Sequence, residues 1–334
     1  MFESQEDSFV IKNFQFTSGE SLPELTLHYR TLGKPKTDGY GRVNNAILIL
    51  HGTSGSGEAF LAPHFAGELF GAGQPFDLKK HFVILPDGIG HGSSSRPSDG
   101  LRASFPQYGY HDMVSAQHRL VTEHLKIERL RLVMGTSMGG MHTWMWGYLY
   151  PDMVEALMPL ASAPIEIAGR NRMLRRMVVD VIMQSPDFDD GKYEEQPFGL
   201  AAAAHIFMLM VGSPYQLQKE APTKEKADAK FDELVAGYRG RFDANDLIYQ
   251  VRASSDYNPQ PHLEKITAPL TAINAADDLV NPPELGILER EIKRVRNGIA
   301  IVQDNWEKLQ GHRSHSFPNL WKEHLIDLLE RSNY

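Results

Sequence analysis

Short apolar runs recur along the chain and alternate with segments whose apolar residues are three or four positions apart. The runs are uninterrupted, which is typical of strands buried on both faces of a sheet. They cover residues 45–50, 81–86, 130–134, 156–161, 270–274 and 299–302. The helical spacing is clear over residues 111–125 and over the last fourteen or so residues, around Trp321, Leu325 and Leu328. Strands alternating with helices predict an α/β fold, with a mainly parallel central sheet and helices on both faces.

Two regions depart from this alternation. Residues 9–16 and 25–32 alternate apolar and polar positions, which predicts an antiparallel pair at one edge of the sheet. Residues 164–261 carry helical patterns and no good candidate for a buried strand. The sequence therefore predicts a core in two parts, 1–163 and 262–334, with a helical lid inserted between them.

Composition narrows the function classes. The 334 residues include 34 Lys and Arg against 42 Asp and Glu, a net charge of −8, and no cysteine. The acidic balance argues against a nucleic-acid partner, and the lack of cysteine excludes disulfides, thiolate metal sites and a cysteine nucleophile. The acidic, polar N-terminus is unlike a secretory signal, and no stretch approaches the ~20 apolar residues of a membrane span. We expect a cytoplasmic protein without a membrane partner.

The strongest motif is Gly-Thr-Ser-Met-Gly at residues 135–139, between a predicted strand and a helical pattern over 142–150. This context is typical of a nucleophile elbow, a sharp turn that exposes the serine hydroxyl. Ser137 is therefore the predicted nucleophile. The N–H of Met138, the next residue, is the predicted first donor of an oxyanion hole.

A serine nucleophile needs a base and an acid, which follow it in the order Asp or Glu, then His, in this architecture. Asp277 and Asp278 come just past the predicted strand at 270–274. That end of a strand is where open α/β sheets bind ligands. We predict Asp277 as the acid because it comes first after the strand, and Asp278 is the alternative.

The predicted base is His312, which directly follows Gly311 between the last strand and the last helix. His315 is the alternative. The His-x-x-His spacing of these two residues is weak support for a metal site, because no third ligand lies in sequence reach. No metal is therefore expected.

The second oxyanion donor is expected in the loop of residues 51–55, which follows an earlier strand and contains small residues. The N–H of Thr53 is the best candidate, with Ser54 beside it. A phosphate-binding loop is the rival interpretation, but no Lys-Ser or Lys-Thr follows. The glycine-rich residues 88–92 continue into serines rather than a helix, so they fail as a dinucleotide-binding motif, and no cofactor is expected.

Substrate contacts are predicted mainly in the insertion. Arg170 begins a basic cluster over residues 170–176 that could bind a substrate carboxylate, although such a cluster also fits a solvated helix face. Met173 and Met208 could line an adaptable apolar pocket or simply fill a core. With Ser54 beside the oxyanion loop, these are the predicted substrate-binding residues for a small-molecule acyl substrate.

Taken together, the motif at 135–141, the loop at 51–55, the Asp277 segment and Gly311-His312 resemble the α/β-hydrolase superfamily. More narrowly they resemble its homoserine O-acetyltransferase-like branch. The resemblance implies a Ser137–His312–Asp277 triad, oxyanion donors at Met138 and the Thr53 loop, and a helical lid. It also suggests a homodimer formed through the lid.

Two departures from that branch bear on the reaction. Its transferases carry Arg-Gln-Ala-Ile before an Asp-Pro-x-Trp turn, and the arginine holds the homoserine carboxylate. Here Val179 stands at that position, and residues 205–213 lack the lid tyrosine that precedes a serine. Because a site built for a charged amino acid should keep its clamp, these departures favour hydrolysis of a less polar ester. The alternatives are an acyl-CoA-dependent transferase, a carbon–carbon bond hydrolase acting on an acid-bearing 1,5-diketone (a meta-cleavage product), and a non-catalytic ligand-binding protein.

Overall fold

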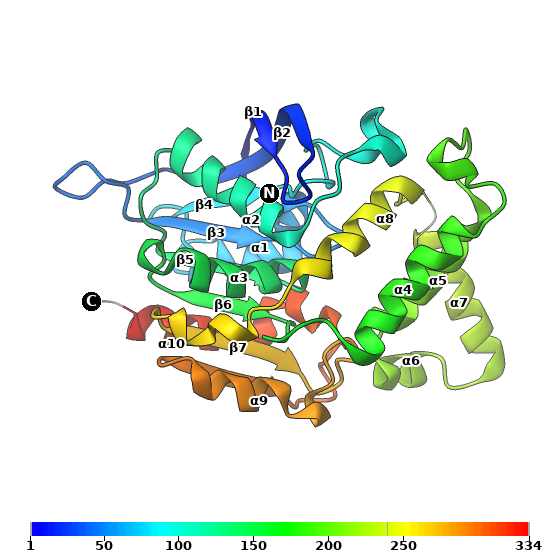
Figure 1. The fold of residues 1–334 in the computed structure, drawn as a ribbon. Helices are drawn as coiled ribbons and strands as arrows, with labels where there is room; N and C mark the ends of the chain where they lie inside the picture. Colours follow the sequence, from blue (N-terminus) through cyan, green and yellow to red (C-terminus); the bar gives the residue numbers. More distant parts are fainter. Residues whose placement is uncertain (1, 239, 333–334) are drawn as a thin grey trace.

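The central feature of the computed structural model, which describes residues 2–238 and 240–332, is one eight-stranded sheet (Figure 1). Its strand order is β1-β2-β4-β3-β5-β6-β7-β8. The pairs β1–β2 and β2–β4 are antiparallel and all other pairs are parallel. The strands are β1 (Gln5–Gln15), β2 (Ser21–Gly33), β3 (Ala46–Leu50), β4 (Phe82–Pro86), β5 (Leu132–Thr136), β6 (Leu157–Leu160), β7 (Leu270–Ala275) and β8 (Gly298–Gln303). The predicted mainly parallel α/β fold, with an antiparallel pair at one edge, is confirmed.

Helices connect the parallel strands. They are α1 (Pro63–Leu69), α2 (Tyr110–Arg119), α3 (Met138–Leu149), α4 (Gly169–Met183), α5 (Phe198–Val211), α6 (Pro214–Glu220), α7 (Lys224–Tyr238), α8 (Ala244–Arg252), α9 (Ile287–Glu291) and α10 (Lys322–Arg331). The predicted helix at 111–125 divides into α2 and a π-helical turn, Leu120–His124. The predicted C-terminal helix begins only at Lys322, because Trp321, with φ −137°, separates it from a 3₁₀ turn at Pro318–Leu320.

Helices cover both faces of the sheet, and β3 shows why its sequence lacks alternation. Leu48 and Leu50 pack into an apolar cluster that includes residues of α2 and α3. Ile47 and Ile49 belong to the opposite cluster, to which α1 and α10 contribute. Since both faces are buried, every position of the strand is apolar.

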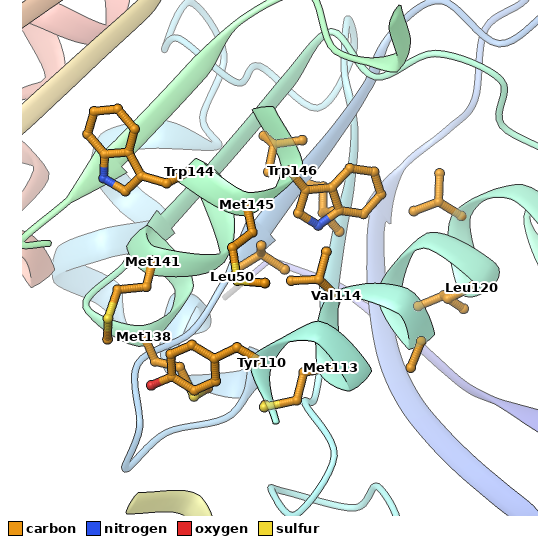
Figure 2. Packing of buried hydrophobic residues seen from close by; sticks show 14 of the residues in the cluster. Leu50, Tyr110, Met113, Val114, Leu120, Met138, Met141, Trp144, Met145 and Trp146 are labelled. Atoms are coloured by element: carbon orange, nitrogen blue, oxygen red, sulfur yellow. The ribbon is translucent and has the colours of Figure 1, made fainter. Parts of the chain in front are cut away.

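Helix α3 is buried on nearly all sides, which fixes the position of its N-terminus. Figure 2 shows the side chains of Trp144, Met145 and Trp146 leaving the helix in different directions among other apolar groups. The Trp144 indole N–H donates to Ser162 Oγ at 3.2 Å, and that of Trp146 donates to Gln117 Oε1 at 3.0 Å. Each buried indole therefore has a polar partner, as the burial of an N–H requires.

Between β6 and β7 the described part of the chain forms α4 to α8 and short 3₁₀ turns, with no strand. In Figure 1, α4, α5, α6 and α7 lie to the right of the sheet, and α8 lies between them and the core. The segment has an apolar cluster of its own, which includes Val178, Ile182, Ala203 and Leu247. It occupies the position in the chain where the lid insertion 164–261 was predicted.

No single helix among the described residues is both long and apolar enough to cross a bilayer. One pair of helices in the described part of the chain, α5 and α6, reaches the length and apolar composition of a membrane span when taken together, but it is bent by 100°.

Candidate active site

A strained turn presents Ser137, the one residue between β5 and α3. Its backbone has φ 55° and ψ −108°, a conformation that L residues other than glycine rarely adopt. Its N–H donates to the Leu160 carbonyl at 2.9 Å, which anchors the turn. An added Cβ on Gly135 would lie 2.2 Å from the carbonyl carbon of Gly139, and one on Gly139 would lie 2.0 Å from the Leu50 oxygen. The two glycines are therefore required by close backbone packing.

His312 joins Ser137 to a carboxylate. Its Nε2 lies 2.8 Å from Ser137 Oγ, and its Nδ1 lies 2.9 Å from Asp278 Oδ2. An ionised carboxylate only accepts hydrogen bonds, so the ring proton is on Nδ1. Nε2 is then free to accept the serine proton. The three side chains form the chain of hydrogen bonds expected for an activated serine.

The carboxylate on His312 belongs to Asp278, so the prediction that Asp277 would contact the imidazole is wrong. The backbone turns sharply after β7, and the Asp278 N–H donates to the Ala275 carbonyl at 3.1 Å. This turn sends the two neighbouring side chains in different directions. Asp277 instead accepts hydrogen bonds from Ser213 Oγ at 2.6 Å and the Gly311 N–H at 2.8 Å.

Asp278 is buried yet held in its charged form. Burial disfavours the charge, but the contact with His312 lowers the pKa of Asp278 below its ordinary value, and backbone N–H groups add to this effect. Those groups are the N–H of Val280, 2.7 Å from Oδ1, and the N–H of Asn281, 3.2 Å from the same oxygen. The carboxylate is thus fixed in orientation as well as in charge.

The loop at 51–55 lies directly against the nucleophile, since an added Cβ on Gly52 would be 3.5 Å from Ser137 Cβ. Its orientation is set by His51, whose Nδ1–H donates to the Gly52 carbonyl at 2.8 Å and whose Nε2 accepts the Gly88 N–H at 2.9 Å. Burial lowers the pKa of His51, in keeping with this neutral form. In a trans peptide the N–H points opposite to the carbonyl, so the Thr53 N–H points away from His51.

Met138 is the first residue of α3, where backbone N–H groups have no partner within the helix. The positive end of the helix dipole also lies there, which favours a developing negative charge. Of the two predicted oxyanion donors, Met138 directly follows Ser137, and Thr53 follows Gly52, the residue of the loop that packs against Ser137. Their catalytic role stays a prediction.

A cavity of about 700 Å³ opens onto Ser137 and His312. Its walls combine the polar loop at 51–55 with apolar side chains from the inserted helices. The inserted helices contribute, among others, Val178, Phe207, Met210, Val211 and Val251. The cavity is large enough for a small ester or a drug-sized ligand.

Of the four predicted substrate contacts, only Ser54 lines this cavity. Arg170 donates through Nη1 to the Leu279 carbonyl and lines a separate cavity of about 200 Å³. Met173 is 68% exposed, and Met208 is buried away from the described cavity walls, whereas its neighbour Met210 lines them. Arg170, Met173 and Met208 therefore do not line this cavity, and their role as substrate contacts stays a prediction without support from its walls.

Arg175, from the same basic cluster as Arg170, was not singled out by the sequence but lines the cavity and is only 5% exposed. Its Nε donates to Asn171 Oδ1 at 2.9 Å, and its Nη1 donates to Ser254 Oγ at 3.2 Å. Both partners are neutral, and no carboxylate of the described residues lies within salt-bridge distance of the guanidinium. A buried cation with no paired carboxylate among the described residues therefore lines the cavity.

His315, the alternative base, also lines the cavity but does not contact Ser137. Burial and the neighbouring His312 lower the pKa of His315 to about 3, so this ring is neutral. Its Nδ1 lies 3.0 Å from Ser316 Oγ. Among the residues described, no group of three His, Asp or Glu side chains is arranged to hold a metal ion.

Comparison with known proteins shows the family to which the chain belongs. Residues 45–296 match the model of the alpha/beta hydrolase fold. The chain is 32% identical to a homoserine O-acetyltransferase of Pasteurella multocida over 304 residues, 81% of each chain. Among solved structures it is similar to homoserine O-acetyltransferase from Bacillus anthracis (TM-score 0.86, 21% identity, 99% of each chain). It is also similar to an acetylester hydrolase from Corynebacterium glutamicum (TM-score 0.82, 21% identity, 98% and 96% of the two chains). The chain belongs to the α/β-hydrolase family, in its homoserine O-acetyltransferase-like branch.

Proposed function

We propose that this enzyme hydrolyses a carboxylic ester through an acyl-enzyme on Ser137. The observation that carries the proposal is the chain of hydrogen bonds Ser137–His312–Asp278, whose first two members line a cavity of about 700 Å³. A serine hydroxyl hydrogen-bonded to an imidazole, which is itself oriented by a buried carboxylate, is the arrangement that acyl transfer requires.

In the first half of the reaction, Ser137 Oγ attacks the ester carbonyl while His312 Nε2 accepts its proton. The N–H groups of Met138 and Thr53 stabilise the oxyanion of the tetrahedral intermediate. His312 then gives the proton to the leaving alcohol, and the acyl group stays on Ser137. Asp278 stabilises the imidazolium and keeps the proton of the resting ring on Nδ1, the role that the sequence assigned to Asp277.

In the second half, His312 removes a proton from water, which attacks the acyl-enzyme and releases the acid. An alcohol could replace water, which makes an acyl-CoA-dependent transferase the second candidate. Two observations favour it: the 32% identity to a homoserine O-acetyltransferase, and the cation of Arg175. Arg175 lies one helical turn before Val179, the position of the family's arginine, so the loss of charge there is partly offset.

A product assay separates the two candidates. We expect purified enzyme to cleave p-nitrophenyl acetate and butyrate. Addition of homoserine should change the rate at which the enzyme consumes acetyl-CoA by less than about twofold. The reason is that Val179 replaces the family's arginine, and the charge of Arg175 lies one helical turn away from that position. The measurement is thiol release from acetyl-CoA with and without homoserine, with O-acetylhomoserine followed by mass spectrometry. Rapid formation of O-acetylhomoserine would establish the transferase instead.

Arg175 also bears on the substrate class. A guanidinium in a cavity wall can bind a carboxylate through two parallel hydrogen bonds. Its present partners, Asn171 and Ser254, are neutral and do not offset its charge. We therefore propose that the substrate carries a carboxylate as well as the reacting acyl group. The same property would suit the acid-bearing diketone of a carbon–carbon bond hydrolase.

Arg175→Met is expected to lower kcat/KM for p-nitrophenyl hydrogen succinate by roughly 10- to 100-fold, the value of a charge-assisted hydrogen-bonded contact. The neutral p-nitrophenyl butyrate, of similar size, should change by less than about threefold. Arg170→Met is the matched control, because Arg170 lies on the same helix but outside this cavity. Equal losses on both esters would contradict a carboxylate contact at Arg175.

A further inference from the structure

Asp277, displaced from the role expected of it, links two parts of the chain that are far apart in sequence. It is only 5% exposed. One oxygen, Oδ2, accepts both the Ser213 hydroxyl at 2.6 Å and the Gly311 N–H at 2.8 Å. Ser213 stands between α5 and α6 of the inserted segment, and Gly311 immediately precedes His312. A single carboxylate oxygen thus joins the inserted helices to the loop that carries the base.

The two partners are themselves in close backbone contact. Gly311 has φ +63°, and an added Cβ there would lie 2.8 Å from the carbonyl carbon of Gly212. Ser213 Oγ also accepts the Gln216 N–H at 3.2 Å as the N-cap of α6, which orients its hydroxyl proton toward Asp277. The Gln216 side chain donates to the Glu307 carbonyl at 3.2 Å. Helix α6 therefore contacts the segment before His312 at two separate points.

Asp277 and Asp278 divide the positioning of the base between them. Asp278 holds the ring of His312, and Asp277 holds the backbone N–H one residue earlier. We propose that Asp277 is a positioning residue, which holds the His312 loop in its catalytic position only while the α5–α6 junction is seated on it through Ser213. This inference rests on the proposed function, because it presumes that His312 is the base.

The linkage predicts an effect on chemistry rather than on substrate binding. Neither Ser213 nor Asp277 lines the described walls of the large cavity. Their loss should therefore loosen His312 without removing a substrate contact. Ser213→Ala is expected to lower kcat for p-nitrophenyl acetate by about three- to tenfold, with KM changed by less than about twofold. Labelling of Ser137 by a fluorophosphonate, which also needs the base, should slow by the same factor.

A double-mutant cycle tests whether the two residues act through one linkage. Asp277→Ala removes both hydrogen bonds and is expected to lower kcat by more than Ser213→Ala does. The double variant should then equal Asp277→Ala, because the Ser213 hydroxyl has no partner left. Ser185→Ala is the matched control: the Ser185 hydroxyl also bonds a carboxylate, but that carboxylate belongs to Asp187 and is not shared with the Gly311 N–H. It should leave kcat within about twofold of the wild type.

The outcomes separate this inference from the proposed function. A wild-type enzyme that neither cleaves the ester nor reacts with the fluorophosphonate contradicts the proposed function. Wild-type activity with equal kcat for Ser213→Ala and Ser185→Ala overturns the positioning role alone, as does a double variant whose losses simply multiply. A purely structural role would lower the melting temperature of Ser213→Ala without changing kcat of the folded enzyme. If Asp277→Ala does not fold, Ser213→Ala alone still tests the positioning role, because that role predicts a lower kcat with an unchanged KM.

Discussion

Ser137→Ala is expected to lower kcat for ester hydrolysis by about four to six orders of magnitude. The substitution removes the only atom to which the acyl group can be transferred in the proposed mechanism. The oxyanion donors and the cavity remain, so a residual rate above that of water should persist. The measurement is release of p-nitrophenol under saturating p-nitrophenyl acetate.

The fold should survive this change, because alanine at φ 55° is no more strained than the serine already there. An unchanged circular dichroism spectrum and melting temperature would confirm this. Ser185→Ala again serves as the control for a serine lost elsewhere. A kcat within tenfold of the wild type would show that hydrolysis proceeds without an acyl-serine, and the proposed mechanism would fail.

The second large effect is expected at the carboxylate. Asp278→Asn should lower kcat by about four orders of magnitude, by analogy with the same change in serine-protease triads. An amide that donates to Nδ1 favours the ring tautomer with its proton on Nε2, and Nε2 then cannot accept the Ser137 proton. Because the pKa of Asp278 lies below its ordinary value, the native carboxylate is ionised throughout the usual assay range.

Asp277→Asn provides a matched comparison, one residue away and equally conservative. The asparagine carbonyl oxygen can still accept the N–H of Gly311 and the Ser213 hydroxyl, so kcat should fall by less than about tenfold. Both variants are assayed for kcat on the same ester. A larger loss for Asp277→Asn than for Asp278→Asn would reverse the assignment made from the structure.

The fold was predictable because burial on both faces leaves a strong signal. Runs of apolar residues located each parallel strand, and the predicted boundaries differ from the observed ones by two residues at most. The largest shift is at β5, predicted at 130–134 and found at Leu132–Thr136. Leu130 forms only an isolated bridge with Val154, so it is apolar and buried without belonging to the strand. Hydrophobicity reports burial, whereas strand ends depend on hydrogen-bond pairing.

The nucleophile and base were predictable for a different reason. Gly135 and Gly139 lie two residues on either side of Ser137, and Gly311 directly precedes His312. Close backbone packing requires each of these glycines, and such positions leave a motif in the sequence. The choice between Asp277 and Asp278 was not predictable. It depends on a turn after β7, in which the Asp278 N–H bonds to the Ala275 carbonyl. The order of residues along the chain places both carboxylates at the same edge of the sheet, just after β7. It does not indicate which of the two contacts His312.

Arg175 was missed although a signal existed. It lies in phase with Val178, Val179 and Ile182, at spacings of three, four and seven residues, and all three are buried. An arginine on the apolar face of a helix differs from its neighbours on the solvated face, such as Arg176. The prediction treated the basic residues 170–176 as one group. The helical periodicity would have distinguished Arg175, on the apolar face, from the arginines on the solvated face.

The central claim is that an acyl group resides on Ser137 during turnover, and mass spectrometry tests it directly. Enzyme quenched in acid during steady-state hydrolysis of p-nitrophenyl butyrate is digested, and the peptide that contains residues 135–139 is sequenced. The account predicts a butyryl group on Ser137 in the wild type and none in Ser137→Ala. A butyryl group on another residue would contradict the account. So would an enzyme that turns over the ester with no butyryl group on the peptide and no labelling of Ser137 by a fluorophosphonate.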